Sequence, residues 1–265
     1  SAYQKSMLTI SHIYGDGFNR PQLSKLEKIG FRIRPQISTY MGSQICRFID
    51  FEKGPSLEVI EVTNERDYLD FVPEGMKPYC PGIELALPEG SESSLAAFEN
   101  GFSHLCPNTI HVNYDGSMDQ RQPGWNYLNF ETPVVTDTFI WLAESEEPIP
   151  VREHITNHPN GVKGILGFVF DLEPDKLRGF SKLVKQDLSG GTIKLGGIEV
   201  WLKNTIDDFP DVHDKIFPLI AIILKVANLD YFAAQMDNVR KVSFMSGPAV
   251  HIETNMQSWD LLITL

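Results

Sequence analysis

Cysteine is scarce in this chain of 265 residues, which has only Cys46, Cys80 and Cys106. An odd number of cysteines without a CxxC pair does not fit a disulfide framework or a structural zinc site. We therefore expect a reducing compartment and place the protein in the cytoplasm. The sequence also lacks a GxSxG elbow, a P-loop and a GxGxxG turn after a strand, and no cysteine lies in a recognisable nucleophile motif.

Basic residues are too few for a polyanion binder. The 23 Lys and Arg are outnumbered by 35 Asp and Glu, so the formal net charge is -12. Nucleic-acid affinity is built on clustered Lys and Arg, and an anionic membrane surface selects for the same residues. The longest hydrophobic run, residues 217–224, is far short of the roughly 20 residues of a membrane span. We expect neither a nucleic-acid nor a membrane partner.

What the chain does have is enough apolar sequence for a sizeable core, and an order of elements that recurs. Hydrophobic residues make up 42% of the sequence. A strand, a helix and then further strands are predicted four times. The first two passes have strands at 7–13, 31–38, 44–51 and 56–62 around a helix at 22–29, then strands at 81–87, 109–115, 125–131 and 137–144 around a helix at 91–100. The last two have strands at 164–172, 192–195 and 197–203 around a helix at 175–187, then strands at 218–226, 241–246, 249–255 and 258–265 around a helix at 229–239.

Residues 145–161 are rich in charge, proline and asparagine and have no periodicity, as is typical of a linker. We therefore predict an α+β protein of four βαβββ modules, with one pair of modules in residues 1–150 and the other in 151–265. The alternative is that a generous reading of any α+β sequence yields such runs.

Three stretches carry a family resemblance: His12 on the first strand, the segment 42–62, and the HPNG sequence at 158–161. Together with the strand at 81–87 they resemble glyoxalase-like domain proteins of the vicinal-oxygen-chelate superfamily, which includes glyoxalase I, extradiol dioxygenases and bleomycin-resistance proteins. The resemblance implies two cupped mixed sheets, each made by a pair of modules. It also implies metal ligands on inward-facing positions of the first and last strands of each module.

Carried over to this sequence, the resemblance implies a metal site of His12, Glu58 and Glu84. Glu84 occupies the position in the second module that His12 has in the first, and the position equivalent to Glu58 falls near Trp141, which is not a ligand. One imidazole and two carboxylates suit a divalent ion such as Mn²⁺, Fe²⁺, Ni²⁺, Co²⁺ or Zn²⁺. Glu58 and His111 are the candidate catalytic residues, and the candidate pocket walls are Trp125, Tyr127 and Trp141.

Alternation along the strand at 56–62 separates its two glutamates. Glu58 shares a face with Ile60, whereas Glu61 shares the other face with Leu57 and Val59. If the helix of the first module packs on Leu57 and Val59, Glu58 faces the cup and Glu61 reaches water at the strand end. A carboxylate among apolar neighbours is costly without a partner, so we expect Glu58 to have one.

Plainer interpretations stay open for each candidate. His12 could be a strand histidine satisfied by a neighbouring hydrogen bond, and Glu84 could face solvent. Trp125 and Tyr127 could serve packing alone. His158 could form a turn with the Pro-Asn-Gly that follows it, or fold over the mouth of the cup.

The C-terminal half repeats the glutamate at Glu199 but has no ligand at the position of His12, and its last strand offers only Asp260. We therefore expect a single site in the N-terminal half. The expected function is a metal-dependent lyase, isomerase or dioxygenase acting on a small oxygenated substrate. The alternative is a non-enzymatic protein that sequesters a small ligand, and pairing of two chains into a homodimer stays open.

Overall fold

A computed structural model describes most of the chain. The described residues are 8–16, 19–35, 37–40, 43–70, 72, 74–86, 102–105, 109–112, 118–121, 127–130, 133–143, 153–188, 190–254 and 257–265. For residues 38–40, for the strands between 102 and 129, and for residues 153–154, the description is of the backbone alone. The predicted helix at 91–100, together with Cys106 and Trp125, lies outside the described residues.

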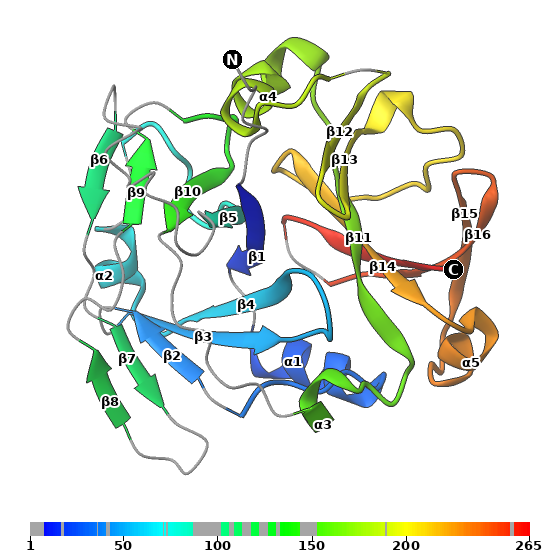
Figure 1. Ribbon diagram of the computed structural model, residues 1–265. Coiled ribbons are helices and arrows are strands. Elements are labelled where there is room, and N and C mark those ends of the chain that lie inside the picture. The colour runs from blue at the N-terminus through cyan, green and yellow to red at the C-terminus, as the bar shows by residue number, and fades with distance from the viewer. Residues whose placement is uncertain are drawn as a thin grey trace.

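The first half forms a ten-stranded mixed sheet with β1 and β4 as its two central strands (Figure 1). The strand order is β6-β9-β10-β5-β1-β4-β3-β2-β7-β8. The elements are β1 (Thr9–Asp16), α1 (Arg20–Lys28), β2 (Ile37–Tyr40), β3 (Gln44–Ile49), β4 (Ser56–Val62), α2 (Glu65–Leu69), β5 (Gly82–Ala86), β6 (Phe102–Leu105), β7 (Thr109–Val112), β8 (Met118–Arg121), β9 (Tyr127–Phe130) and β10 (Phe139–Ala143).

The second half forms a seven-stranded mixed sheet in the order β12-β13-β11-β14-β17-β16-β15. Its elements are α3 (Glu153–Thr156), β11 (Val162–Phe170), η2 (Pro174–Leu177), α4 (Arg178–Val184), β12 (Thr192–Leu195), β13 (Ile198–Leu202), η3 (Lys203–Thr205), β14 (Leu219–Val226), α5 (Leu229–Ala234), β15 (Arg240–Phe244), β16 (Gly247–Ile252) and β17 (Asp260–Thr264).

The predicted α+β class with two mixed sheets is confirmed, and the modules differ in detail. The first and fourth have the full βαβββ order, whereas the third has only β12 and β13 between its helix and β14. The second includes a hairpin, β7–β8, that pairs with β2 at the opposite edge of the sheet from β9 and β10. Such long-range pairing leaves no local signature in the sequence.

Two predicted strand boundaries in the first module were wrong. The first strand was predicted to end at Ile13 but runs to Asp16, because β1 pairs with β4 as far as Asp16. The strand predicted from Phe31 begins only at Ile37. The intervening Pro35 has no N–H to donate to a neighbouring strand, which disfavours ladder pairing there.

The main core lies between the two sheets and their helices. Leu23 and Leu26 of α1 pack with Leu57 and Val59 of β4 in one buried cluster, which continues into the second sheet. The helix begins with a capping box in which Asn19 and Gln22 satisfy each other's backbone N–H groups. The face of β4 that carries Leu57 and Val59 is therefore the helix-covered face.

The HPNG segment joins the halves. Asn160 is fully buried, donates from Nδ2 to the Ile29 carbonyl (3.0 Å), and accepts from the Val162 N–H (3.0 Å). Gly30 makes this approach feasible, because a Cβ there would lie 2.9 Å from the Cβ of Asn160. The side chain thus terminates α1 and begins β11.

His158 is also buried by this junction. Its Nδ1 accepts from the Arg32 N–H (3.0 Å), so its Nε2 carries the proton and donates to the Asp50 carbonyl (2.7 Å). Its own carbonyl accepts from the Gly161 N–H, which closes a turn. Burial lowers the pKa of His158 and favours the neutral imidazole. His158 therefore packs under the first sheet and does not cover the mouth of the cup.

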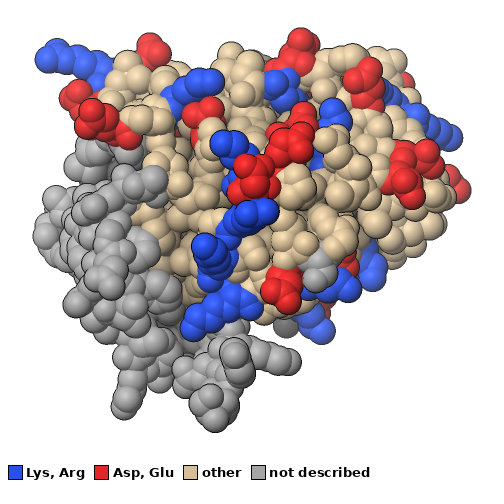
Figure 2. Space-filling model, turned by 90° about the horizontal axis from the view of Figure 1, so that it is seen from above, with Lys and Arg blue, Asp and Glu red and all other residues tan. Residues whose placement is uncertain are grey.

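The described surface mixes both signs of charge. Figure 2 shows Lys and Arg side chains lying beside Asp and Glu over one face. Within the described residues, no helix is long and apolar enough to cross a membrane.

Replacing Asn160 with alanine is expected to lower the free energy of unfolding by about 2–4 kcal/mol, because it leaves a buried carbonyl and a buried N–H without partners. Chemical denaturation measures the change. Asn157→Ala is the matched control, since Asn157 lies in the same segment with an exposed side chain. Equal stabilities of the two variants would contradict the junction role of Asn160.

Candidate functional site

β1 is the central strand of the candidate site, and a bulge sets its register. The pairing of β1 with β5 shifts between Ile10 and His12. Ile10 and Ile13 therefore both reach the core although they are three residues apart, while His12 faces the opposite side. An extra residue in one strand can aim a polar side chain without removing apolar ones from the core.

β4 and β5 place their glutamates on the same side as His12. Glu58 lies between core residues Leu57 and Val59, and Glu84 lies between core residues Ile83 and Leu85. Strict alternation turns both glutamates away from that core. His12 pairs directly with Glu84 across the antiparallel ladder, and β4 runs parallel on the other side of β1.

The three predicted ligands come together at one point. His12 Nε2 lies 2.8 Å from Glu58 Oε2 and 3.0 Å from Glu84 Oε2. The glutamates are 6% and 4% exposed as whole residues, so neither faces solvent. Burial opposes a charge on His12, but Glu84 and Glu58 outweigh it and raise the pKa of His12 well above its usual value.

One oxygen of this cluster has no hydrogen bond within the described part of the chain. Glu58 Oε2 is buried, and its short contact with His12 lacks hydrogen-bond geometry. The donor set of one imidazole and two carboxylates suits a divalent ion.

The donor atoms also contact each other directly. Among the described residues, no group of three or more His, Cys, Asp or Glu side chains already frames a position for a metal ion. The donor types and the unbonded Glu58 oxygen favour an ion, whereas the direct contacts satisfy His12 without one. The residues therefore fit a divalent ion in chemistry, and holding it requires the three side chains to move from their present direct contacts.

Aromatic groups border the cluster. The Phe48 ring meets the His12 ring edge-on, with 5.7 Å between the ring centroids, and the Arg34 guanidinium lies over the Phe48 ring, 4.2 Å from its centroid. Trp141 meets the Tyr14 ring at 6.1 Å and pairs with Glu84 across β10 and β5. Directly opposed residues share a face, so Trp141 borders the same side of the sheet as Glu84.

Comparisons of structure give long matches. The chain matches the 2,3-dioxygenase LapB from Pseudomonas sp. KL28 with a TM-score of 0.52 and 8% identity, over 97% of this chain and 92% of that one. It matches the Mn(II)-bound glyoxalase from Novosphingobium aromaticivorans with a TM-score of 0.53 and 8% identity, over 96% and 81% of the two chains. No family model and no curated protein matches the sequence.

The fold is that of these two solved structures, a 2,3-dioxygenase and a glyoxalase. The resemblance drawn from His12, the segment 42–62 and the HPNG sequence is confirmed at this level. An identity of 8% shows the fold alone, so the ligand roles of His12, Glu58 and Glu84 stay predictions.

The strand pairing in the structure refines one predicted equivalence. His12 and Glu84 are paired across the pseudo-symmetric strands β1 and β5. Glu58 is opposite Tyr14, two residues beyond His12, so its counterpart is Ala143, two residues beyond Trp141. Alanine offers no ligand either, and the second module contributes only Glu84.

The other predicted site residues are placed less fully. His111 lies on β7, three strands from β4 in the sheet order, and the backbone of Tyr127 pairs with Ala143. The side chains of His111 and Tyr127, and all of Trp125, lie outside the described residues. Their predicted roles stay predictions.

Glu61 differs from Glu58 in its surroundings. Its side chain is 26% exposed and accepts a 2.8 Å hydrogen bond from Arg47. The buried Cys46 and Cys80 are free thiols, and burial raises the pKa of both, to about 12 for Cys80. Neither is poised as a thiolate nucleophile.

Asp16 is a polar residue of this face that the sequence interpretation missed. It ends β1, four residues beyond His12, is buried, and accepts a hydrogen bond from the Tyr68 hydroxyl (2.5 Å). Gly15 and Asp16 were assigned to a turn because glycine and aspartate favour turns. Extending the alternation from His12 through residues 14 and 16 would have placed Asp16 on the same face as His12.

The inner face of the second sheet is different. It is filled by an apolar cluster that includes Trp201, Ile223, Phe244 and Leu262. Glu199 pairs with Gly167, and no His, Cys, Asp or Glu stands at positions 165–169. The described part of this face holds apolar packing where the first sheet holds the His12 cluster.

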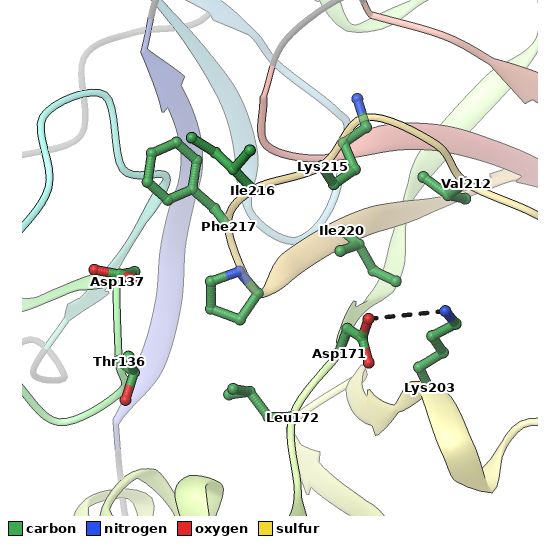
Figure 3. A pocket seen from close by; sticks show the side chains of 11 residues that line it. Thr136, Asp137, Asp171, Leu172, Lys203, Val212, Lys215, Ile216, Phe217 and Ile220 are labelled. Atoms are coloured by element: carbon green, nitrogen blue, oxygen red, sulfur yellow. Dashed lines mark ion pairs between the residues drawn. The ribbon is translucent and has the colours of Figure 1, made fainter.

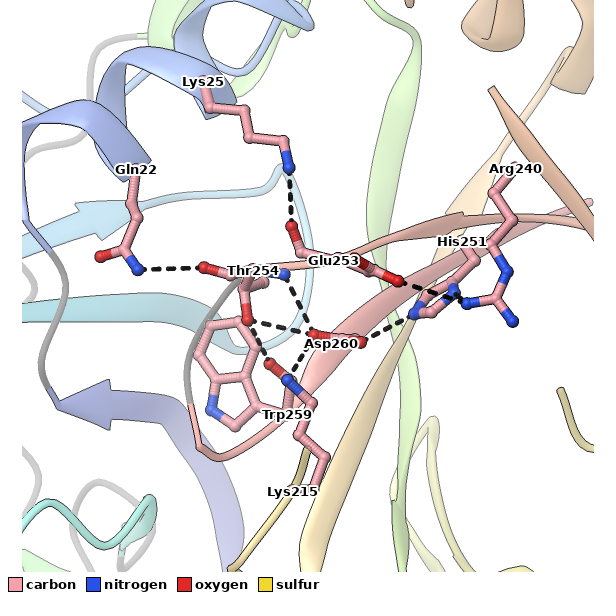
Figure 4. Close-up of polar contacts among 9 residues, drawn as sticks. All are labelled: Gln22, Lys25, Lys215, Arg240, His251, Glu253, Thr254, Trp259 and Asp260. Atoms are coloured by element: carbon pink, nitrogen blue, oxygen red, sulfur yellow. Dashed lines mark hydrogen bonds and ion pairs between the residues drawn. The ribbon is translucent and has the colours of Figure 1, made fainter. Parts of the chain in front are cut away.

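One polar network interrupts that apolar face (Figure 4). Asp260 accepts from Lys215 Nζ (2.6 Å), His251 Nε2 (2.7 Å) and the Thr254 N–H (3.0 Å). Arg240 donates to His251 Nδ1 (2.7 Å), so the proton of His251 lies on Nε2. The Asp260 side chain is 2% exposed, and the network is internally satisfied.

A separate pocket of about 270 Å³ lies where the two halves meet (Figure 3). None of the three predicted ligands lines it, and its Lys203 is paired with Asp171 at 3.7 Å. Its lining residues are Thr136, Asp137, Asp171, Leu172, Lys203, Val212, Lys215, Ile216, Phe217, Pro218 and Ile220.

The Asp260 network predicts a pH-dependent contribution to stability. Burial by itself would raise the pKa of Asp260, but hydrogen bonds from His251 and Lys215 outweigh burial and lower the pKa. A lowered pKa stabilises the fold above the usual value near 4, and this stabilisation is lost as the pH falls through the folded-state pKa.

We expect Asp260→Asn to lower the free energy of unfolding by about 3–5 kcal/mol at neutral pH, because it removes the buried carboxylate that pairs with Lys215 and His251. Urea denaturation of both proteins should show the difference shrinking between about pH 5 and about pH 3. Asp171→Asn, in an exposed ion pair, should change little at either pH. If the difference in stability between wild type and Asp260→Asn grew as the pH fell, it would contradict the lowered pKa of Asp260.

Proposed function

We propose that the protein is a metal-dependent enzyme acting on a small oxygenated substrate, as a lyase, isomerase or dioxygenase, with the ion held by His12, Glu58 and Glu84. The observation that carries the proposal is the convergence of one imidazole nitrogen on two buried carboxylate oxygens, at 2.8 and 3.0 Å. The site belongs to the first half, residues 1–150, and the second half, 151–265, supports it.

Charge supports the proposal. An imidazolium between two carboxylates leaves one negative charge uncompensated in a buried place, which is unfavourable. A divalent cation with a neutral imidazole and the same two carboxylates has no net charge. The orphaned Glu58 Oε2 would then have a partner.

When bound, a divalent ion supplies Lewis-acid polarisation of a carbonyl or enolate oxygen. The chain's own side chains orient the candidate ligands and border the site. Phe48 holds the edge of the His12 ring, and Arg34 holds Phe48 while it makes two 2.6 Å hydrogen bonds to Asp50. Trp141, Tyr14 and Phe139 form an aromatic border that excludes water beside Glu84.

A non-enzymatic role is the second candidate, and one observation favours it. The donor atoms contact each other, so His12 already has partners without an ion. In that case the cup would sequester a small ligand by its aromatic border alone. The two candidates differ in whether His12 and Glu58 are needed for metal or only for stability.

Metal analysis separates the candidates. We expect about one Mn²⁺ or Zn²⁺ per chain after loading and gel filtration, measured by plasma mass spectrometry, because the site has one set of ligands. His12→Ala and Glu58→Gln should lose the ion. An ion at about 100 times its dissociation constant should stabilise the wild type by about 2.7 kcal/mol and leave these variants unchanged.

Glu61→Gln is the matched control, because Glu61 lies on the same strand and points to the opposite face. It should keep the metal. A wild-type protein that stays metal-free and binds small oxygenated molecules equally well in His12→Ala would exclude the enzyme and favour sequestration.

A further inference from the structure

Asp16 extends the row of side chains that begins at His12. Residues 12, 14 and 16 of β1 lie on one face, and Glu58 pairs with Tyr14 while Ile60 pairs with Asp16. Asp16 is therefore the diagonal neighbour of Glu58. Nothing in the proposed metal site uses it.

Tyr68 and Tyr79 fix one oxygen of this carboxylate. The Tyr68 hydroxyl accepts from the Tyr79 N–H (2.8 Å), so it must donate its own proton to Asp16 Oδ2. Tyr79 holds its N–H in place with a left-handed backbone (φ 66°), which is strained for a non-glycine residue. The segment before β5 keeps an unfavourable conformation that orders this relay.

The other oxygen has no partner. Asp16 Oδ1 is buried and makes no hydrogen bond among the described residues, in a residue that is 9% exposed. A buried carboxylate oxygen without a donor costs free energy. It is satisfied when it carries a proton or when a ligand supplies a donor.

The surroundings of Asp16 allow its carboxyl group to gain and lose a proton near neutral pH. Burial raises the pKa of Asp16 to about 7, with Glu58 adding to the rise and the Tyr68 hydrogen bond opposing it. Tyr14 of β1, Tyr68 of α2 and Cys80 before β5 also face it, and each has a raised pKa and stays neutral. A carboxylate of this kind is matched to general acid–base work.

We propose that Asp16 is a catalytic residue, whose Oδ1 accepts a proton from the oxygenated substrate bound beside Glu58 and later returns it. This inference rests on the proposed function. The substrate's O–H or C–H bond breaks, its electron pair stays on the substrate, and an O–H bond forms at Oδ1. Tyr68 keeps its hydrogen bond to Oδ2 throughout, so the carboxylate does not turn.

The test uses zinc-loaded protein and 4-nitrocatechol, a chelating diol whose visible spectrum changes when it ionises. Calorimetry in two buffers of different ionisation enthalpy counts the protons released on binding. At about pH 8, Asp16→Asn should release about one more proton per bound diol than the wild type, because the carboxylate no longer takes it up. At about pH 5 the difference should vanish, since Asp16 is then already protonated.

Tyr68→Phe keeps the carboxylate and removes the hydrogen bond that lowers its pKa. The pKa of Asp16 should therefore be higher in this variant. The pH above which Asp16 takes up a proton when the diol binds should then be higher than in the wild type, a shift that a purely structural role of Asp16 would not produce. This variant also carries the test if Asp16→Asn does not fold. Asp70→Asn, at an exposed position just after α2, is the matched control and should behave as wild type.

Equal proton release from wild type and Asp16→Asn at both pH values, with zinc and diol bound, would overturn the role of Asp16 and leave the proposed function standing. Failure of the wild type to bind zinc would overturn the proposed function and this inference together. If the pH midpoint of proton uptake on diol binding is the same in Tyr68→Phe as in the wild type, the catalytic role of Asp16 is contradicted as well.

Discussion

One imidazole shared by two buried carboxylates is the interaction on which the first half depends. His12, Glu58 and Glu84 come from three adjacent strands, β1, β4 and β5, and β4 and β5 belong to different modules. The parallel register of β1 with β4 and the antiparallel register of β1 with β5 must both be correct before the three meet. A slip of one residue in either ladder would turn a glutamate into the core. The site therefore requires the pairing of the two modules.

The second half supports this arrangement from outside the cup. Trp259 is fully buried and donates from Nε1 to the Tyr14 carbonyl (3.0 Å), and Lys25 and Gln22 of α1 donate to carbonyls next to β16 (Figure 4). Its own inner face carries apolar packing and the Asp260 network. An aspartate that accepts from Lys215, His251 and Thr254 has little free capacity for a ligand, whereas Glu58 keeps an oxygen without a hydrogen bond among the described residues. The two sheets thus differ in how a buried carboxylate is satisfied: protein donors surround Asp260, whereas one oxygen of Glu58 is left for a ligand.

The sequence predicted the features that depend on alternation within one strand. The bounds of β4 and the separation of Glu58 from Glu61 follow from a period of two, and a helix on the Leu57 and Val59 face completes the inference. It could not predict features that depend on pairing between distant strands. Gly15 and Asp16 have turn propensity and are strand residues only because β4 lies alongside, and the β7–β8 hairpin joins β2 across the sheet. The counterpart of Glu58 was placed near Trp141, and the ladder moves it to Ala143 because the pairing register, absent from the sequence, decides it.

The positions of His12, Tyr14 and Asp16 along β1 determine how far Asp16 lies from each candidate metal ligand. A strand rises about 3.3 Å per residue, so the Cα atoms of His12 and Asp16 are about 13 Å apart, and Glu58 lies opposite the midpoint of that interval. Tyr14, which occupies the midpoint on β1, leans over Gly82 of β5, where a Cβ would lie 2.1 Å from its ring. Any side chain at position 82 would push that ring back toward β4. Glycine there therefore keeps the side of the row next to Glu58 free of the Tyr14 ring, and Glu58 is the candidate ligand from which a bound substrate has the shortest path to Asp16.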